Sequence, residues 1–137
     1  TGLAGHFGTR QKNGDRKLIL SHAGHRQVLV YRKKENAVEL IELPNGTVMG
    51  LPGTTASRAK AIDLQIGDRF YAFTDGIVEA SNPKGEEFGT KRVMDAVKSL
   101  SAQPIQKTVE ALYTKVAKFT QVPDQQDDIT ILGFELS

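Results

Sequence analysis

Residues 70–80 read FYAFTDGIVEA. The aromatic and apolar run at 70–73 predicts a buried β-strand. The run stops at Asp75 and Gly76, and apolar residues resume at once with Ile77. A carboxylate directly after a core strand indicates either an ordinary turn or a ligand-binding site at the edge of a sheet.

Composition limits what the chain can be. Its 137 residues are enough for one domain with a real core, so residues 1–137 are interpreted as a single domain. Hydrophobic residues make up 39% and charged residues 25%, and the net charge is +2 with both signs interspersed, which gives nucleic-acid binding little support. The absence of Cys excludes disulfides, thiolate catalysis and Cys-bound zinc, and it fits a cytoplasmic protein. No apolar run approaches the ~20 residues of a membrane span.

Short strands are predicted before residue 75. Residues 17–21 and 27–33 are expected to pair as a tight hairpin around the turn Ala23-Gly24-His25. Residues 5–8 are interpreted as a strand-and-turn element, and residues 47–57, rich in Gly, Pro, Thr and Ser, as a loop. Further strands are expected at 38–43, 61–65 and 69–74.

Helical spacing replaces this pattern after residue 89. Two sets of apolar residues recur every three or four positions and predict two amphipathic helices: Val93, Met94, Val97 and Leu100, and then Ile105, Val109, Leu112 and Val116. Lys107, Glu110 and Lys118 are expected to face water. Residues 129–136 are apolar on both faces and are interpreted as a central, covered strand. Strands, then helices, then a strand predict an α+β layered domain.

Carboxylates stand at the ends of two of these predicted strands. Asp75 follows one strand, and Asp127 and Asp128 precede the last. If those strands are antiparallel neighbours, their carboxylates meet at one edge of the sheet, where Mg²⁺ or Mn²⁺ would relieve their repulsion. Gly76 would let the chain turn beside the ion. The alternative is a turn and a strand-end cap without a metal.

The order of short motifs resembles that of metal-dependent protein phosphatases of the 2C type. The resemblance is to the bacterial branch typified by stage II sporulation protein E and the phosphatases that regulate stress sigma factors. The matching motifs, in the family's order, are Ala23-Gly24-His25, Gly50-Leu51, Leu64 with Gly67-Asp68-Arg69, Thr74 to Ala80, Gly85 to Gly89, and Asp127 to Thr130. The resemblance implies a β-sandwich layered with helices.

The resemblance also implies a mechanism. It implies that Asp75 and Asp127 bind the metal together with Gly76. Asp128 is then either a second ligand or a hydrogen-bond acceptor that contacts the ligands but not the metal. A hydroxide activated by two Mn²⁺ or Mg²⁺ ions attacks phosphoserine or phosphothreonine, so that no protein side chain acts on the substrate beyond the metal-bound water. The implied substrate is a phosphorylated regulatory protein such as an anti-sigma-factor antagonist. His25 is interpreted as part of a structural turn or as a contact to the site. Glu79 is interpreted as orienting the Asp75 loop or as beginning a helix.

One motif of the family is missing. An Asp shortly before Gly-His-Gly bridges both metals in the family, and no Asp precedes Gly5-His6-Phe7-Gly8. The chain is therefore expected to be the C-terminal portion of the domain, lacking its first strands and the helices of one layer. It is expected to be inactive alone and to need its upstream half or a second copy of itself. The rival hypothesis is a non-catalytic, degenerate phosphatase-fold module that binds or senses a partner.

Overall fold

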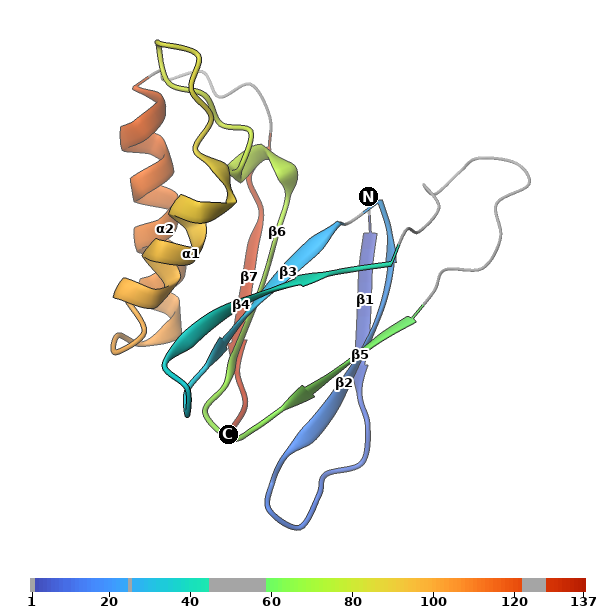
Figure 1. Cartoon of the computed structure of the whole chain (residues 1–137). Helices are drawn as coiled ribbons and strands as arrows, with labels where there is room; N and C mark the ends of the chain where they lie inside the picture. The colour runs from blue at the N-terminus through green and yellow to red at the C-terminus, as the bar shows by residue number, and fades with distance from the viewer. Residues whose placement is uncertain (1, 25, 45–58, 122–127) are drawn as a thin grey trace, which may run out of the picture.

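The structure, a computed structural model, describes residues 2–24, 26–44, 59–121 and 128–137. Within these residues the chain forms seven β-strands, two α-helices and one 3-10 helix (Figure 1). The strands are β1 (Gly2–Phe7), β2 (Arg16–Ala23), β3 (Gln27–Arg32), β4 (Ala37–Glu42), β5 (Ala59–Leu64), β6 (Arg69–Phe73) and β7 (Ile131–Glu135). The helices are η1 (Asp75–Ile77), α1 (Gly89–Ser99) and α2 (Ile105–Thr120).

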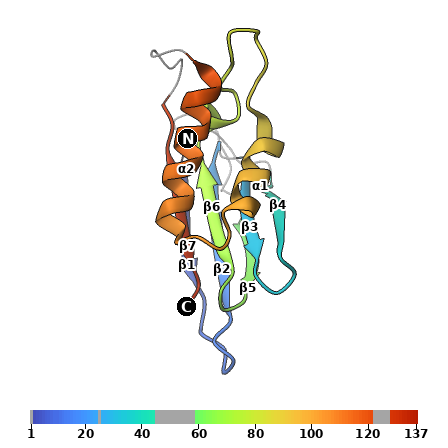
Figure 2. The ribbon, with the colours of Figure 1, turned by 90° about the vertical axis from the view of Figure 1, so that its left-hand side faces the viewer.

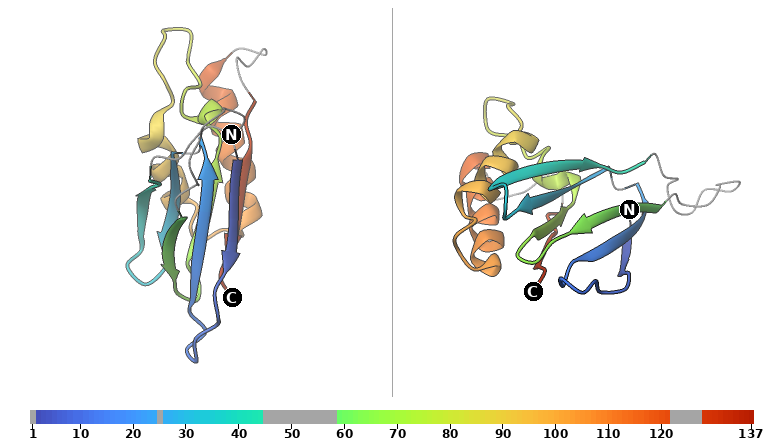
Figure 3. Two further views of the ribbon diagram at one scale, coloured as in Figure 1. Left: turned by 90° about the vertical axis from the view of Figure 1, so that its right-hand side faces the viewer. Right: turned by 60° about the horizontal axis from the view of Figure 1, so that its bottom comes forward.

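The strands form two antiparallel sheets that pack against each other. One sheet has the order β1-β2-β5 and the other the order β4-β3-β6-β7. Helices α1 and α2 lie on the outer face of the four-stranded sheet, which Figure 2 shows from the helical side and Figure 3 from two other directions. The predicted α+β class, a β-sandwich layered with helices, is confirmed.

The core between the sheets follows from strand alternation. Side chains on one face of each strand point into the sandwich: Leu18, Leu20, Val28, Val30, Ile41, Ile62, Leu64, Phe70 and Ala72. The rings of Phe70 and Phe134 stack with their centroids 5.0 Å apart. Burying each large apolar side chain stabilises the fold by about 1.5–3 kcal/mol, so this layer contributes strongly to the stability of the sandwich.

The opposite face of the four-stranded sheet forms a second core with the helices. Leu29, Tyr71 and Phe73 meet residues of the predicted helical stripes, of which Val93, Val97, Leu112 and Val116 are buried. Ile105 and Val109 pack against this cluster at its margin, whereas Lys107, Glu110 and Lys118 are exposed. Both predicted helices and the orientation of α2 are confirmed.

The predicted hairpin between residues 17–21 and 27–33 is wrong. Strand β2 pairs with β1 and β5, and β3 pairs with β4 and β6, so the two strands belong to different sheets. Near Gly24, whose φ is +77°, the chain crosses from one sheet to the other. Leu20 and Val28 consequently face each other across the sandwich instead of lying side by side.

The predicted central position of the last strand is also wrong. Strand β7 lies at the end of the four-stranded sheet and pairs only with β6 among the described strands. The other predicted strands lie within two residues of their expected bounds, and β1 occupies the expected strand-and-turn element. The predicted loop at 47–57 lies outside the described residues. Neither α1 nor α2, the two α-helices of the described part, has the length and apolar character that crossing a membrane requires.

Candidate metal site

Strands β6 and β7 end side by side at the predicted site. They are antiparallel, and Phe73 pairs with Ile131 at the last position of the ladder. One residue further, the Thr74 N–H donates to the Thr130 carbonyl at 3.1 Å. The antiparallel neighbourhood on which the metal hypothesis depended is therefore present.

The Thr74 hydroxyl holds the two strand ends together. It donates to the backbone carbonyl of Asp128 at 2.9 Å and accepts from the Thr130 N–H at 3.0 Å. In the sequence, Thr74 was named only as the first residue of the motif Thr74 to Ala80 and was given no role of its own. A β-branched hydroxyl residue immediately before the strand-end carboxylate was the signal that could have found it.

These two bonds of the Thr74 hydroxyl to Asp128 and Thr130 form a clamp between the strand ends, and Asp75 begins η1 directly after it. Its carbonyl accepts the N–H groups of Val78 at 3.0 Å and Glu79 at 2.9 Å, so the turn is fixed by the backbone of the candidate ligand itself. Its side chain is exposed, while Gly76 and Ile77 are buried beneath it. Because η1 is an ordinary right-handed turn, Gly76 is not required here for a left-handed conformation.

The other predicted site residues are placed only in part. Asp128 is exposed at the same end of the sheet as Asp75. Asp127 and His25 lie outside the described residues, so the predicted meeting of Asp75 and Asp127 stays a prediction. Glu79 is exposed and follows η1; no helix begins there, since α1 starts only at Gly89.

The donors at this edge suit a hard divalent cation. Asp75 and Asp128 offer carboxylate oxygens and Gly76 a backbone carbonyl, the ligand types that Mg²⁺ and Mn²⁺ prefer. Exposed carboxylates at a strand end can coordinate an ion while water completes its shell. Over the described ranges, no group of three His, Cys, Asp or Glu side chains is arranged to hold a metal. Among the described residues, this end of the sheet therefore carries two of the predicted carboxylates, Asp75 and Asp128, and no assembled metal site.

A mainly apolar hollow of about 220 Å³ adjoins the clamp. Leu3 lines it from β1, while Thr74, Thr130 and Leu132 line it from the ends of β6 and β7. It lies between the edges of the two sheets, on the side of the molecule where β1 and β7 run near each other (Figure 3, left). The hollow thus leaves open space beside Thr74, the residue that precedes Asp75.

The loop after η1 connects the candidate site to the helical layer. The Phe88 N–H donates to the Ala80 carbonyl at 2.8 Å, and the Gly89 N–H donates to the Val78 carbonyl at 2.9 Å. The start of α1 is thereby tied to the turn that carries Asp75 (Figure 1).

Several solved structures share this fold, and phosphatase domains are among them. The SiaA-PP2C domain of Pseudomonas aeruginosa matches at 26% identity and a TM-score of 0.69, covering 88% of this chain and 47% of that one. The phosphatase domain of the cell fate determinant SpoIIE from Bacillus subtilis matches at 16% identity and 0.67, covering 98% and 56%. A Mycobacterium tuberculosis protein, solved as its RsbU and RsbW domains, matches at 24% identity and 0.69, covering 87% and 32%.

The chain spans about half the length of the first two of these structures. No curated protein matches it. The family model described as Stage II sporulation protein E (SpoIIE) matches residues 8–137, nearly the whole sequence. The chain therefore belongs to the stage II sporulation protein E family, whose phosphatase domains share the 2C-type fold.

Proposed function

We propose that this chain is part of a metal-dependent protein serine/threonine phosphatase. One observation carries the proposal: in a chain of this family, β6 and β7 bring the exposed residues Asp75 and Asp128 to one end of a sheet. Carboxylates gathered at a strand end suit a reaction in which cations neutralise phosphoryl charge.

Asp75, Asp127 and Asp128 would hold Mn²⁺ or Mg²⁺ through carboxylate oxygens, and Gly76 would contribute its carbonyl. When bound, a pair of such ions would supply a nucleophilic water-derived hydroxide and would stabilise the charge on the phosphoryl group. Thr74 would orient the segment that carries Asp128 through its bond to the Asp128 carbonyl. The buried Gly76-Ile77 pair would keep the Asp75 side chain directed outward.

The proposed substrate is a phosphoserine or phosphothreonine on a regulatory protein, such as an anti-sigma-factor antagonist, in the cytoplasm. Membership in a family whose solved phosphatase domain belongs to a cell fate determinant supports a regulatory phosphoprotein as substrate. The exposed position of Asp75 supports a protein-sized substrate over a small buried ligand, because a folded phosphoprotein can reach only an open edge.

Further ligands are proposed to come from another segment, either an upstream half of the domain or a second copy of the chain. Three carboxylates and one carbonyl are too few protein ligands to fix two ions in place, even though water can complete the coordination shell of each ion. Such a segment would fit in the hollow beside Thr74 and Thr130 and along the side of β7 that pairs with no described strand.

The alternative is a non-catalytic phosphatase-fold module that binds a partner. An upstream segment without an Asp ahead of Gly-His-Gly would favour this module, whereas an Asp there would favour the enzyme. Such a module would keep the clamp at Thr74 for structural reasons and would bind no metal at Asp75.

Calorimetric titration with Mn²⁺ separates the two functions. We expect weak binding by the chain and a loss of tenfold or more in affinity for Asp75→Asn, while Asp63→Asn, an exposed carboxylate on β5, leaves it unchanged. Hydrolysis of a phosphoserine protein in Mn²⁺ is then compared between the chain and an N-terminally extended form. The phosphatase is supported if only the extended form turns over substrate and Asp75→Asn abolishes that turnover. The metal site is rejected if Asp75→Asn leaves the affinity for Mn²⁺ unchanged.

A further inference from the structure

A groove of about 550 Å³ runs between the outer sides of α1 and α2. Its apolar lining consists of Phe88, Ala96 and Phe119. The rings of Phe88 and Phe119 meet edge to face with centroids 5.3 Å apart, and Phe88 and Ala96 are buried. The groove therefore has a rigid, partly aromatic floor on which an apolar side chain can pack.

Arg92 forms a fixed wall of this groove. Its guanidinium carbon lies 4.8 Å from the centroid of the Phe119 ring, and its Nη1 donates to the carbonyls of Glu87 at 2.8 Å and Phe88 at 2.9 Å. A guanidinium carries five N–H donors, and no hydrogen bond to a residue that the structure describes engages Nε or Nη2. Arg92 is thus held in place by contacts that leave donors for another molecule, which lowers the entropy cost of binding.

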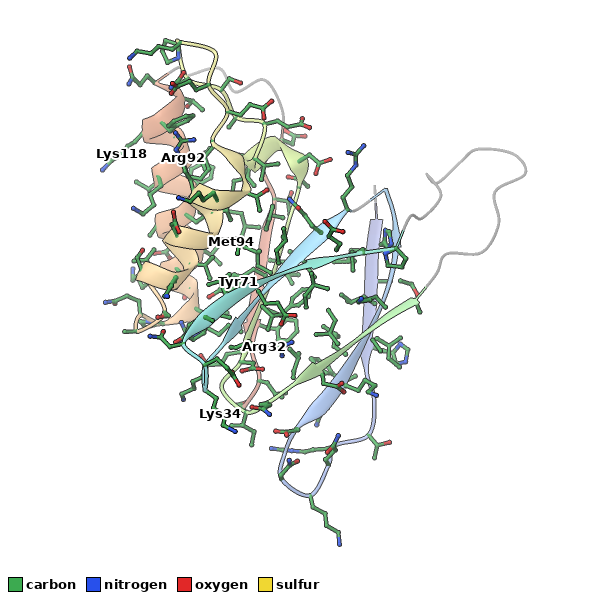
Figure 4. All side chains as sticks on the ribbon, in the orientation of Figure 1. Arg32, Lys34, Tyr71, Arg92, Met94 and Lys118 are labelled. Atoms are coloured by element: carbon green, nitrogen blue, oxygen red, sulfur yellow. The ribbon has the colours of Figure 1, made fainter. Side chains whose placement is uncertain are left out.

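The opposite wall adds positive charge. Lys115 and Lys118, one turn apart on α2, line the groove with Arg92, and the acidic residue there is Asp95 (Figure 4 labels Arg92 and Lys118). Lysines three residues apart on a helix repel each other. Lys107, further along the same helix, pairs with Glu110 at 3.0 Å, whereas Lys115 and Lys118 have no ion pair with any residue that the structure describes.

We propose that this groove docks an acidic segment of a partner protein. Carboxylates of the segment would accept from the free donors of Arg92 and would relieve the repulsion between Lys115 and Lys118. An apolar side chain of the same segment would pack on the floor at Phe119 and Ala96. Three cations against one anion in a concave, aromatic setting match a short amphipathic acidic peptide in both charge and shape.

The groove lies next to the candidate site without sharing its residues. Phe88, on the groove floor, is hydrogen-bonded to Ala80, which follows the turn that carries Asp75. A partner bound there would be held near the metal edge, while its binding would not need the metal.

The test uses a fluorescein-labelled synthetic peptide of repeated Glu-Glu-Leu triplets, titrated with the chain by fluorescence anisotropy in EDTA. The double variant Lys115→Glu/Lys118→Glu is compared with Lys98→Glu/Lys107→Glu, which has the same net charge but alters lysines outside the groove. We expect saturable binding that weakens about tenfold or more in the groove variant, about twofold or less in the control, and progressively with added salt.

Thermal melting by circular dichroism verifies that both double variants remain folded, and Arg92→Gln provides a second groove variant whose binding should also weaken. The same peptide built from Lys-Lys-Leu triplets should not bind. Equal affinity of the two double variants for the acidic peptide overturns the proposal, as does binding of the basic peptide or the absence of saturation at millimolar concentrations.

Discussion

Replacing the buried carboxylate of Asp68 with a methyl group should cost this domain a large part of its stability. Asp68 lies in the turn between β5 and β6, where the chain passes from one sheet to the other, and its side chain is 1% exposed. Its Oδ2 accepts from Arg32 Nη1 at 3.0 Å and from the Gln65 N–H at 3.1 Å, and its Oδ1 accepts from the Lys33 N–H at 3.1 Å. Three hydrogen bonds to one carboxylate therefore tie the end of β3 to the turn between β5 and β6.

The magnitude follows from what Asp68→Ala leaves behind. Removing one partner of a buried ion pair costs about 3–5 kcal/mol, because the remaining charge is uncompensated. Arg32 keeps its bonds to Glu39 at 2.8 Å and to the Asp63 carbonyl at 2.6 Å, and its side chain is 22% exposed, so part of the loss is recovered. We expect a loss of about 3 kcal/mol, a large fraction of the roughly 5–15 kcal/mol that holds a typical domain together.

Asp63→Ala is the matched control, since it makes the same chemical change on the neighbouring strand. The Asp63 side chain is 79% exposed, and its carboxylate lies 3.6 Å from Lys17 Nζ, so its removal should cost about 0.5 kcal/mol or less. Urea denaturation followed by circular dichroism measures both variants. If Asp68→Ala unfolds at the urea concentration of the control, the turn is not held by this carboxylate and the reasoning is refuted.

Three further changes test other parts of the fold. Leu112→Asp should unfold or aggregate the chain because it buries a carboxylate in the helical core, while Tyr113→Asp, at a 52% exposed position, should stay soluble with nearly the native melting temperature. Burial raises the pKa of the Tyr71 phenol, so the stability that the protonated phenol contributes is complete below the ordinary pKa of about 10 and is lost as pH rises through the raised value. In urea titrations at alkaline pH, Tyr71→Phe should therefore lose less stability than the native chain. Equal losses in the two proteins would contradict this. Thr74→Val removes two hydrogen bonds of about 1 kcal/mol each and should accelerate amide exchange of Thr130 by about thirtyfold, whereas unchanged exchange would show that the hydroxyl does not hold the strand ends.

The helical layer was the most predictable part of the fold. In α2, the spacing of Leu112 and Val116 identified the buried face because a helix repeats every 3.6 residues and its partner surface is a single sheet. Such a pattern needs no knowledge of distant contacts.

The pairing of β2 and β3 was not predictable from the same kind of information. Both strands alternate apolar residues and are separated by a short turn, which is equally typical of a hairpin and of a connection between the layers of a sandwich. What decides between them is whether Leu20 and Val28 bury their surface side by side or face to face. That depends on β5 and β6, which follow only after residue 58.

The candidate site was predictable to the extent that it depends on strand ends. Asp75 could be placed at a sheet edge because a core strand visibly stops there, and the antiparallel pairing with β7 confirmed that position. The residue type of Thr74 could indicate a hydroxyl that bonds to the backbone, but its partners Asp128 and Thr130 could not be predicted. The clamp requires the β6–β7 register, which brings Thr74 opposite Thr130, and register is fixed by the whole ladder and not by local sequence.

The last strand shows how a correct local observation led to a wrong position. Residues on both faces of β7 are apolar, and both faces are partly covered: Ile131 packs toward the helices, while Phe134 packs into the sandwich and stacks on Phe70. Two-sided apolarity therefore reports the layers above and below a strand. It does not report the neighbours beside it, and in the described sheet β7 has β6 on one side only. Leu132, on the same face as Phe134, is 54% exposed and lines the hollow next to Thr130, so the cover over that face of β7 is incomplete at this end of the strand.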